Sequence, residues 1–194
     1  AEVTVKEDTY AAAYATNPKK DKSIICILGT GSNCSYFDGE ELHQKVQSLG
    51  YIAMDDCSGN RFGRDLVRAY YFNKMPKNLA EQFAQEYDLE PDTIKHNLYK
   101  EPNPNAYLAT FAKFLIQHKD DAFIKGLITD AMQVFVDNYI TQYDNAHEVP
   151  VHFVGSIAFY LKAELAEVLS KNGLKLGNVL RRPIDGLIEY HKLN

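Results

Sequence analysis

The sequence predicts an α/β fold built on a mixed sheet, and three observations support this prediction. An isoleucine-rich run at residues 23–28 has the length and the β-branched composition of a buried strand. Residues 62–143 repeat apolar side chains at spacings of three and four, which is typical of helices. The last third of the chain alternates strand and helix patterns. We therefore expect one sheet that carries a helical insert.

Each expected element rests on its local pattern. The strand at 23–28 leads through a glycine-rich turn into a neighbouring strand at 33–37, and a third short strand is expected at 44–46 or 51–53. Prolines divide the helical insert into segments at 64–72, 79–87, 106–118 and 122–143. The chain then closes with a strand at 149–156, a helix at 157–173, a strand at 174–180 and a helix at 183–191.

Composition limits the classes of function. The chain has 194 residues, of which 45% are hydrophobic and 24% charged, and no run is long enough for a membrane helix. A net charge of -5 with scattered lysines argues against nucleic acid as a partner. Three cysteines, an odd number, argue against a disulfide framework and favour the cytoplasm. The chain opens at Ala1 without a signal peptide, and we expect it to be part of a longer protein.

The turn at residues 28–33 (LGTGSN) is the first candidate site. Gly29 and Gly31 permit a tight turn with outward-facing amides, and Thr30, Ser32 and Asn33 add short polar side chains. Such a concave group of amides binds phosphate oxygens. The alternative is an ordinary β-turn between two strands. The pattern is neither a Walker loop nor a dinucleotide fingerprint, because a strand follows it.

A second glycine turn lies between the strand and the helix of residues 149–173. Gly155 and Ser156 stand at this junction, where unpaired amides and the helix dipole suit a nucleotide. The alternative is an ordinary turn in which Ser156 caps the helix.

Three carboxylates are further candidates. Asp8 stands at the expected start of a small helix, where it is either functional or a helix cap. Asp55 and Asp56 are adjacent and precede a serine-glycine turn, so they either hold sugar hydroxyls or a hydrated magnesium ion, or form a solvated acidic loop. The histidines show no metal-ligand spacing, and we predict no protein metal site.

Five segments, taken together and in order, resemble the BadF/BadG/BcrA/BcrD ATPase family, and most closely its N-acetylglucosamine kinase-like branch. This resemblance implies the actin-like ATPase superfamily of sugar kinases, which has two ribonuclease-H-like lobes around a nucleotide cleft. The five segments extend over essentially the whole chain and are VKEDTYAAAYAT (5–16), ICILGTGSN (25–33), LGYIAMDDCSGNRFGRDLV (49–67), VPVHFVGSIAFYLKAEL (149–165) and PIDGLIEYH (183–191).

The resemblance implies a role for each candidate. Asp8 corresponds to the catalytic base that accepts the proton of the attacking sugar hydroxyl. Residues 29–33 correspond to the second phosphate loop, which faces the phosphates of ATP, and Asn33 also lies near the sugar. Gly155 and Ser156 belong to the adenosine motif. The predicted sites are therefore catalytic Asp8, a nucleotide site of Gly29, Thr30, Gly31, Ser32, Gly155 and Ser156, and a sugar site of Asn33, Asp55 and Asp56.

The sequence departs from the family at two places. The family reads Gly-Asp-Glu-Gly-Ser-Gly where this chain has MDDCSG, so Met54 and Cys57 replace glycines, and both could crowd the sugar site. Nothing resembles the family's first phosphate loop. We therefore expect residues 1–194 to form a C-terminal lobe with a helical insert at about 62–143, and expect it to be inactive without the N-terminal lobe.

These observations leave three hypotheses. The leading one is an ATP- and Mg²⁺-dependent kinase of an amino sugar such as N-acetylglucosamine. The second is an ATPase that activates a radical enzyme through an iron-sulfur cluster, although Cys26, Cys34 and Cys57 are not placed for cluster binding. The third is a non-catalytic sugar- or nucleotide-binding lobe. The aromatic residues of the insert favour a homodimer.

Overall fold

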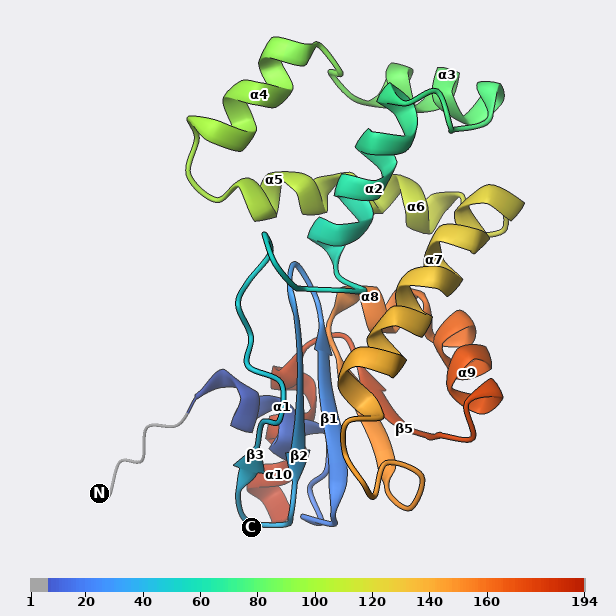
Figure 1. Ribbon diagram of the computed structural model, residues 1–194. Helices are drawn as coiled ribbons and strands as arrows, with labels where there is room; N and C mark the ends of the chain where they lie inside the picture. Colours follow the sequence, from blue (N-terminus) through green and yellow to red (C-terminus); the bar gives the residue numbers. More distant parts are fainter. Residues whose placement is uncertain (1–6, 194) are drawn as a thin grey trace.

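A five-stranded mixed sheet forms the centre of the computed structural model, which describes residues 7–193. The spatial order of the strands is β3-β2-β1-β4-β5. Strands β1 and β2 form an antiparallel hairpin, and β4 and β5 extend the sheet in parallel from β1 (Figure 1). The strands are β1 (Ser23–Leu28), β2 (Ser32–Phe37), β3 (Leu42–His43), β4 (Pro150–Val154) and β5 (Lys175–Leu180).

Two helices cover one face of the sheet. Helix α1 (Asp8–Thr16) packs its alanines Ala12 and Ala13 against Ile25 and Phe37. The small alanine side chains let α1 lie close to the strands. Helix α10 (Pro183–Leu193) packs beside α1, where the rings of Tyr14 and Tyr190 stack at 4.6 Å.

The larger core lies on the other face of the sheet. Side chains of β1 that alternate with Ile25, namely Ile24, Cys26 and Leu28, are buried there. The helices on this face are α7 (Ala122–Phe135), the π-helical turn η1 (Val136–Ile140), α8 (Ser156–Tyr160) and α9 (Lys162–Lys171), whereas α2 (Gly59–Tyr71) packs against α5 (Pro104–Thr110) and α6 (Ala112–Gln117). Because β1 is covered on both faces, all of its residues after Ser23 are apolar.

The helical insert stands above the tip of the β1–β2 hairpin (Figure 1). It consists of α2 together with α3 (Lys77–Glu86), α4 (Pro91–Tyr99), α5 (Pro104–Thr110) and α6 (Ala112–Gln117). Phe83 and Phe114 lie at its centre, with ring centroids 5.0 Å apart in an edge-on arrangement. Among the helices of residues 7–193, none is long and apolar enough to cross a bilayer.

The structure confirms the predicted α/β class, the hairpin and the closing strand-helix-strand-helix unit, and it corrects four details. The third strand is Leu42–His43, not 44–46 or 51–53. Helix α4 was not among the predicted segments. The expected helices at 106–118 and 157–173 are each two helices, which meet at Phe111 and Leu161. Both residues are buried, so the apolar pattern continues across the break while the backbone does not.

Candidate functional site

The β1–β2 hairpin ends in a tight turn of residues 29–31, which we call the hairpin turn. Leu28 pairs with Ser32, and the Gly29 amide donates to the Gly31 carbonyl at 3.0 Å. The tip lies against the start of α2, where the Gly59 amide donates to the Gly29 carbonyl at 2.8 Å. The turn is therefore fixed by contacts on both of its sides.

Asp55 lies directly beneath the hairpin turn. Its backbone is left-handed with φ 64°, and its Oδ1 accepts from the Ser32 amide at 3.2 Å. A Cβ on Gly31 would come within 2.7 Å of Asp55 Oδ2, so this position has no room for a side chain. Among the described residues, the Asp55 carboxylate accepts hydrogen bonds that hold the hairpin turn in place. Its predicted role in sugar binding remains a prediction.

Asp56, the neighbouring carboxylate, is engaged differently. It forms an ion pair with Arg61, whose Nε donates to Asp65 at 2.7 Å. The side chain of Asp56 therefore faces the first turn of α2. Its predicted contact with a sugar also remains a prediction.

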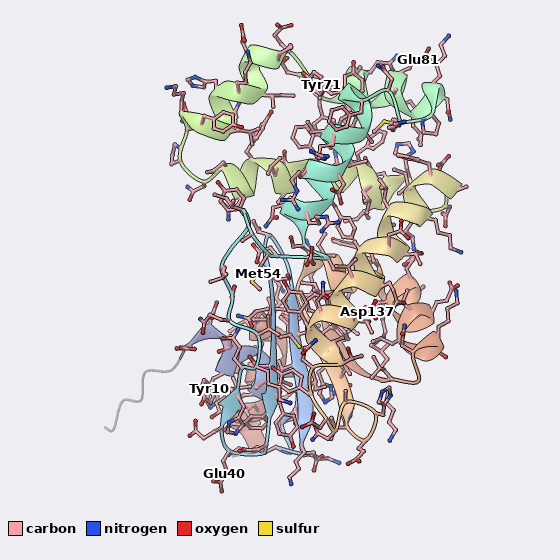
Figure 2. All side chains as sticks on the ribbon, in the orientation of Figure 1. Tyr10, Glu40, Met54, Tyr71, Glu81 and Asp137 are labelled. Atoms are coloured by element: carbon pink, nitrogen blue, oxygen red, sulfur yellow. The ribbon has the colours of Figure 1, made fainter. Side chains whose placement is uncertain are left out.

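Met54 and Cys57 lie outside the lining of both pockets described below. The Met54 sulfur accepts from the Leu49 amide at 3.4 Å, on the segment that rises to α2 (Figure 2). Cys57 is fully buried in the core with φ 59°, a left-handed conformation that glycine adopts more readily.

The second glycine turn, between β4 and α8, touches the hairpin from the side. Gly155 has φ 124°, and a Cβ there would lie 2.2 Å from the Leu28 carbonyl oxygen. Gly155 occupies the N-cap position, so Ser156 is the first helical residue and not the expected cap. Helix α8 ends at Tyr160 after a little more than one turn. The dipole of such a short helix is small, so it attracts a nucleotide less strongly than the longer predicted helix would.

A pocket of about 400 Å³ opens at the hairpin turn, and we call it the turn pocket. This volume lies in the range of small-molecule sites. Arg181 lies over the ring of Tyr160 at 5.3 Å and holds this aromatic wall in place. The lining residues are Gly29, Thr30, Gly59, Ala109, Ala112, Lys113, Ile116, Gln117, Ser156, Ile157 and Tyr160.

A second, larger pocket of about 620 Å³ lies beside α1, and we call it the α1 pocket. Asn33 Oδ1 accepts from Gln44 Nε2 at 2.9 Å, and the Tyr10 hydroxyl donates to Glu41. Tyr10 stands beside β3 in Figure 2. The lining residues are Glu7, Thr9, Tyr10, Asn33, Ser35, Glu41, Leu42 and Gln44.

Four of the ten predicted site residues line these two pockets. Gly29, Thr30 and Ser156 line the turn pocket, although the last is distant in sequence from the first two. Asn33 lines the α1 pocket. Exposed Asp8 opens α1 between Glu7 and Thr9, which both line that pocket. Gly31, Ser32 and Gly155 support the hairpin turn and are absent from the lining of both pockets.

Sequence reasoning missed the wall that the insert contributes to the turn pocket. Ala109, Ala112 and Ile116 recur at spacings of three and four, and Lys113 and Gln117 follow two of them. In a continuous helix this spacing places them on one side, and in the structure Ala109 lies on α5 and the other four lie on α6. The signal was present in the sequence, but it is the same signal that a buried helix face gives.

Comparisons with known proteins identify the architecture. No protein-family model matches the chain, and no curated protein matches it. A provisionally named N-acetylglucosamine kinase of Porphyromonas gingivalis superposes with a TM-score of 0.90 at 40% identity, over 96% of this chain and 65% of that one. The chain has the actin-like ATPase and sugar kinase fold.

Two more distant structures share this fold. A second provisionally named N-acetylglucosamine kinase, from Chromobacterium violaceum, has a TM-score of 0.73 at 17% identity, with 96% of this chain and 65% of that chain covered. A ROK family glucokinase from Streptomyces griseus, solved with glucose and AMPPNP, has a TM-score of 0.51 at 16% identity, over 98% of this chain and 67% of that chain. The chain thus spans about 65% of the first two proteins.

Proposed function

We propose that this chain is the larger part of an ATP-dependent sugar kinase, with the nucleotide in the turn pocket and the sugar in the α1 pocket. The observation that carries the proposal is that one short segment serves both pockets. Thr30 lines the first and Asn33 lines the second. Three residues span at most about 11 Å, so groups bound in the two pockets can meet at the hairpin turn. A phosphoryl transfer needs this arrangement.

The chemistry assigns a role to each side of the turn. A hydroxyl of the sugar attacks the γ-phosphorus, and the bond from that phosphorus to the β–γ bridging oxygen breaks, which releases ADP. Asp8 takes the hydroxyl proton, as the family resemblance implies. The described residues contain no cluster of three or more His, Cys, Asp or Glu side chains suited to a metal ion. Magnesium therefore enters this proposal with ATP, held by its phosphate oxygens.

The substrate class we propose is an amino sugar such as N-acetylglucosamine. Two supports are the polar lining of the α1 pocket and the name of the Porphyromonas gingivalis protein, with which this chain shares 40% identity. The narrower assignment to the BadF/BadG/BcrA/BcrD family remains a prediction. The same holds for the C-terminal lobe, a homodimer and a cytoplasmic location.

The radical-enzyme alternative gains no support from the cysteines. Cys26, Cys34 and Cys57 are buried in the core, and the Cys26 and Cys34 sulfurs are 3.5 Å apart across β1 and β2. A cluster shared between two subunits needs thiolates at a surface.

The test is sugar-dependent release of ADP. It uses this chain alone and this chain joined to a polypeptide equivalent to the 35% of the Porphyromonas gingivalis protein that it does not span. We expect turnover with N-acetylglucosamine or glucosamine only in the longer protein, and we expect Asp8→Asn to abolish turnover while sugar binding persists. A longer protein that binds Mg-ATP but consumes none with any of N-acetylglucosamine, glucosamine and glucose would refute the kinase.

A further inference from the structure

The start of α2 determines which way the hairpin turn presents its backbone. The amides of Gly59 and Asn60 donate to the carbonyls of Gly29 and Thr30 at 2.8 and 3.0 Å. In a trans peptide the N–H points away from the C=O of the same unit. The amides of Thr30 and Gly31 therefore point away from α2.

These two amides are available to a ligand. Within residues 7–193, no group accepts a hydrogen bond from the Thr30 or the Gly31 amide. The Thr30 residue is exposed and lines the turn pocket. Two successive amides that point outward from a turn form a small concave site for an anion.

The side chain of Asn60 binds the hairpin turn on the side that faces α2. It is 2% exposed, and its Nδ2 donates to the Thr30 carbonyl at 2.7 Å and to Asp55 Oδ2 at 3.0 Å. Since a side-chain amide nitrogen carries two hydrogens, both are used. Asp55 in turn accepts from the Ser32 amide. Asn60 thus connects the Thr30 carbonyl in the turn to Asp55, which binds the Ser32 amide at the start of β2.

We propose that Asn60 is a positioning residue that fixes the direction of the Thr30 and Gly31 amides and so sets the affinity of the turn for the polyphosphate of a nucleotide. The inference rests on the proposed nucleotide site. It assigns no chemistry to Asn60 itself, which is buried beneath the turn.

The chemistry of position 60 explains why an asparagine suits it. The side chain faces two acceptors, a carbonyl and a carboxylate, so it must donate twice and carry no negative charge. Alanine would leave the buried Asp55 oxygen without this donor and the Thr30 carbonyl with only the backbone amide. The peptide units of the turn would then lose a fixed orientation, and preorganised donors are worth more than mobile ones.

The experiment measures binding of three probes to the chain by calorimetry: Mg-ADP, inorganic tripolyphosphate and adenosine. We expect Asn60→Ala to weaken Mg-ADP and tripolyphosphate about tenfold and to leave adenosine unchanged. The matched control is Asn97→Ala, because Asn97 Nδ2 also donates to a backbone carbonyl, that of Thr93 at 2.9 Å, but within α4. The control should bind all three probes like the wild type.

The outcomes separate the two proposals. If the wild type binds neither Mg-ADP nor tripolyphosphate, the proposed nucleotide site is refuted and this inference with it. If the wild type binds both and Asn60→Ala binds them equally well, only the role of Asn60 is refuted. An equal loss for adenosine would also refute it, because the effect would then be a general disturbance of the pocket.

A measurement on the wild type covers the case in which Asn60→Ala does not fold. In nitrogen-15 NMR spectra, tripolyphosphate should shift the Thr30 and Gly31 amide signals. The Asn60 side-chain protons should exchange with solvent at least tenfold more slowly than those of exposed Asn78. Exchange at the same rate for both would show that the buried contact is not maintained, and would overturn the proposal.

Discussion

The α carbon of Gly155 lies so close to the Leu28 carbonyl that a Cβ on Gly155 would come within 2.2 Å of that oxygen. The contact joins the end of β1 to the turn that begins α8, and it brings Ser156 to the same pocket as Gly29 and Thr30. The distance between two parts of the proposed nucleotide site is thus set by the absence of a side chain.

Gly155→Ala should therefore destabilise the protein. The added methyl group meets backbone, and φ 124° is a strained conformation for alanine, so we expect a loss of at least about 2 kcal/mol in the free energy of unfolding. Urea unfolding measures this loss. The control is Gly126→Ala within α7, where nothing lies within 4 Å of the new Cβ and helix propensity predicts a gain of up to about 1 kcal/mol. Equal stability of the two variants would contradict the prediction.

Tyr160→Ala should weaken Mg-ADP binding about fivefold, and Tyr160→Phe should bind like the wild type. The reason is that the Tyr160 ring lines the turn pocket and offers a face to the base, with stacking worth roughly 1–3 kcal/mol. Calorimetry provides the measurement. Phe159, the neighbouring aromatic residue, is outside the pocket lining, so Phe159→Ala serves as the control. A larger effect from Phe159→Ala than from Tyr160→Ala would contradict this placement of the base.

Ser35→Ala should lower the affinity for N-acetylglucosamine about fivefold without changing that for Mg-ADP. Ser35 is 5% exposed and lines the α1 pocket, and its hydroxyl makes no hydrogen bond within residues 7–193. A sugar hydroxyl or amide would provide one, worth about 1 kcal/mol. Competition calorimetry checks both ligands. The idea fails if the variant binds the sugar as the wild type does.

His152 should make stability fall as the pH is lowered. Its ring is 7% exposed, and burial lowers its pKa to about 4, while Asp21 opposes the shift. In the unfolded chain the pKa is about 6.5, so the unfolded state binds more protons between pH 6.5 and 4. Above pH 6.5 the His152 ring has no effect on the free energy of unfolding, and at about pH 4 it lowers that free energy by about 3 kcal/mol.

Urea unfolding measured across this pH range tests whether stability falls as the pH is lowered. The neutral ring is needed because its Nδ1 accepts from the Asn178 amide at 2.8 Å. His152→Gln should flatten the dependence on pH, whereas His147→Gln, at an exposed position, should leave it unchanged. A steeper dependence in the His152 variant would show that the sign is wrong.

The sequence predicted those parts of the fold that depend on local pattern. The strand at 23–28 is apolar after Ser23 because it is covered on both faces, and the turn that follows it contains the glycines that a tight turn requires. The breaks at Phe111 and Leu161 could not be predicted, because both residues are apolar, lie in periodic runs and are buried. Their positions depend on how the helices pack.

The candidate site was predictable in part for the same reason. Glycines at motif positions identified the hairpin turn, whereas the role of Asp8 comes from the family resemblance and remains a prediction. The links from Asn60 to Thr30 and from Asp55 to Ser32 join residues far apart in the sequence, and no periodicity indicates such contacts. The insert wall of the turn pocket is visible only once α5 and α6 stand above the hairpin.

The buried cysteines give the protein a natural reporter of unfolding. All three are free and enclosed by the core, and burial raises the pKa of the Cys26 and Cys57 thiols, so that they remain protonated and unreactive while the core is closed. A thiol-modifying dye therefore reacts only when the core around these cysteines opens. The rate of labelling counts those openings directly, in the unmodified chain, without an introduced probe.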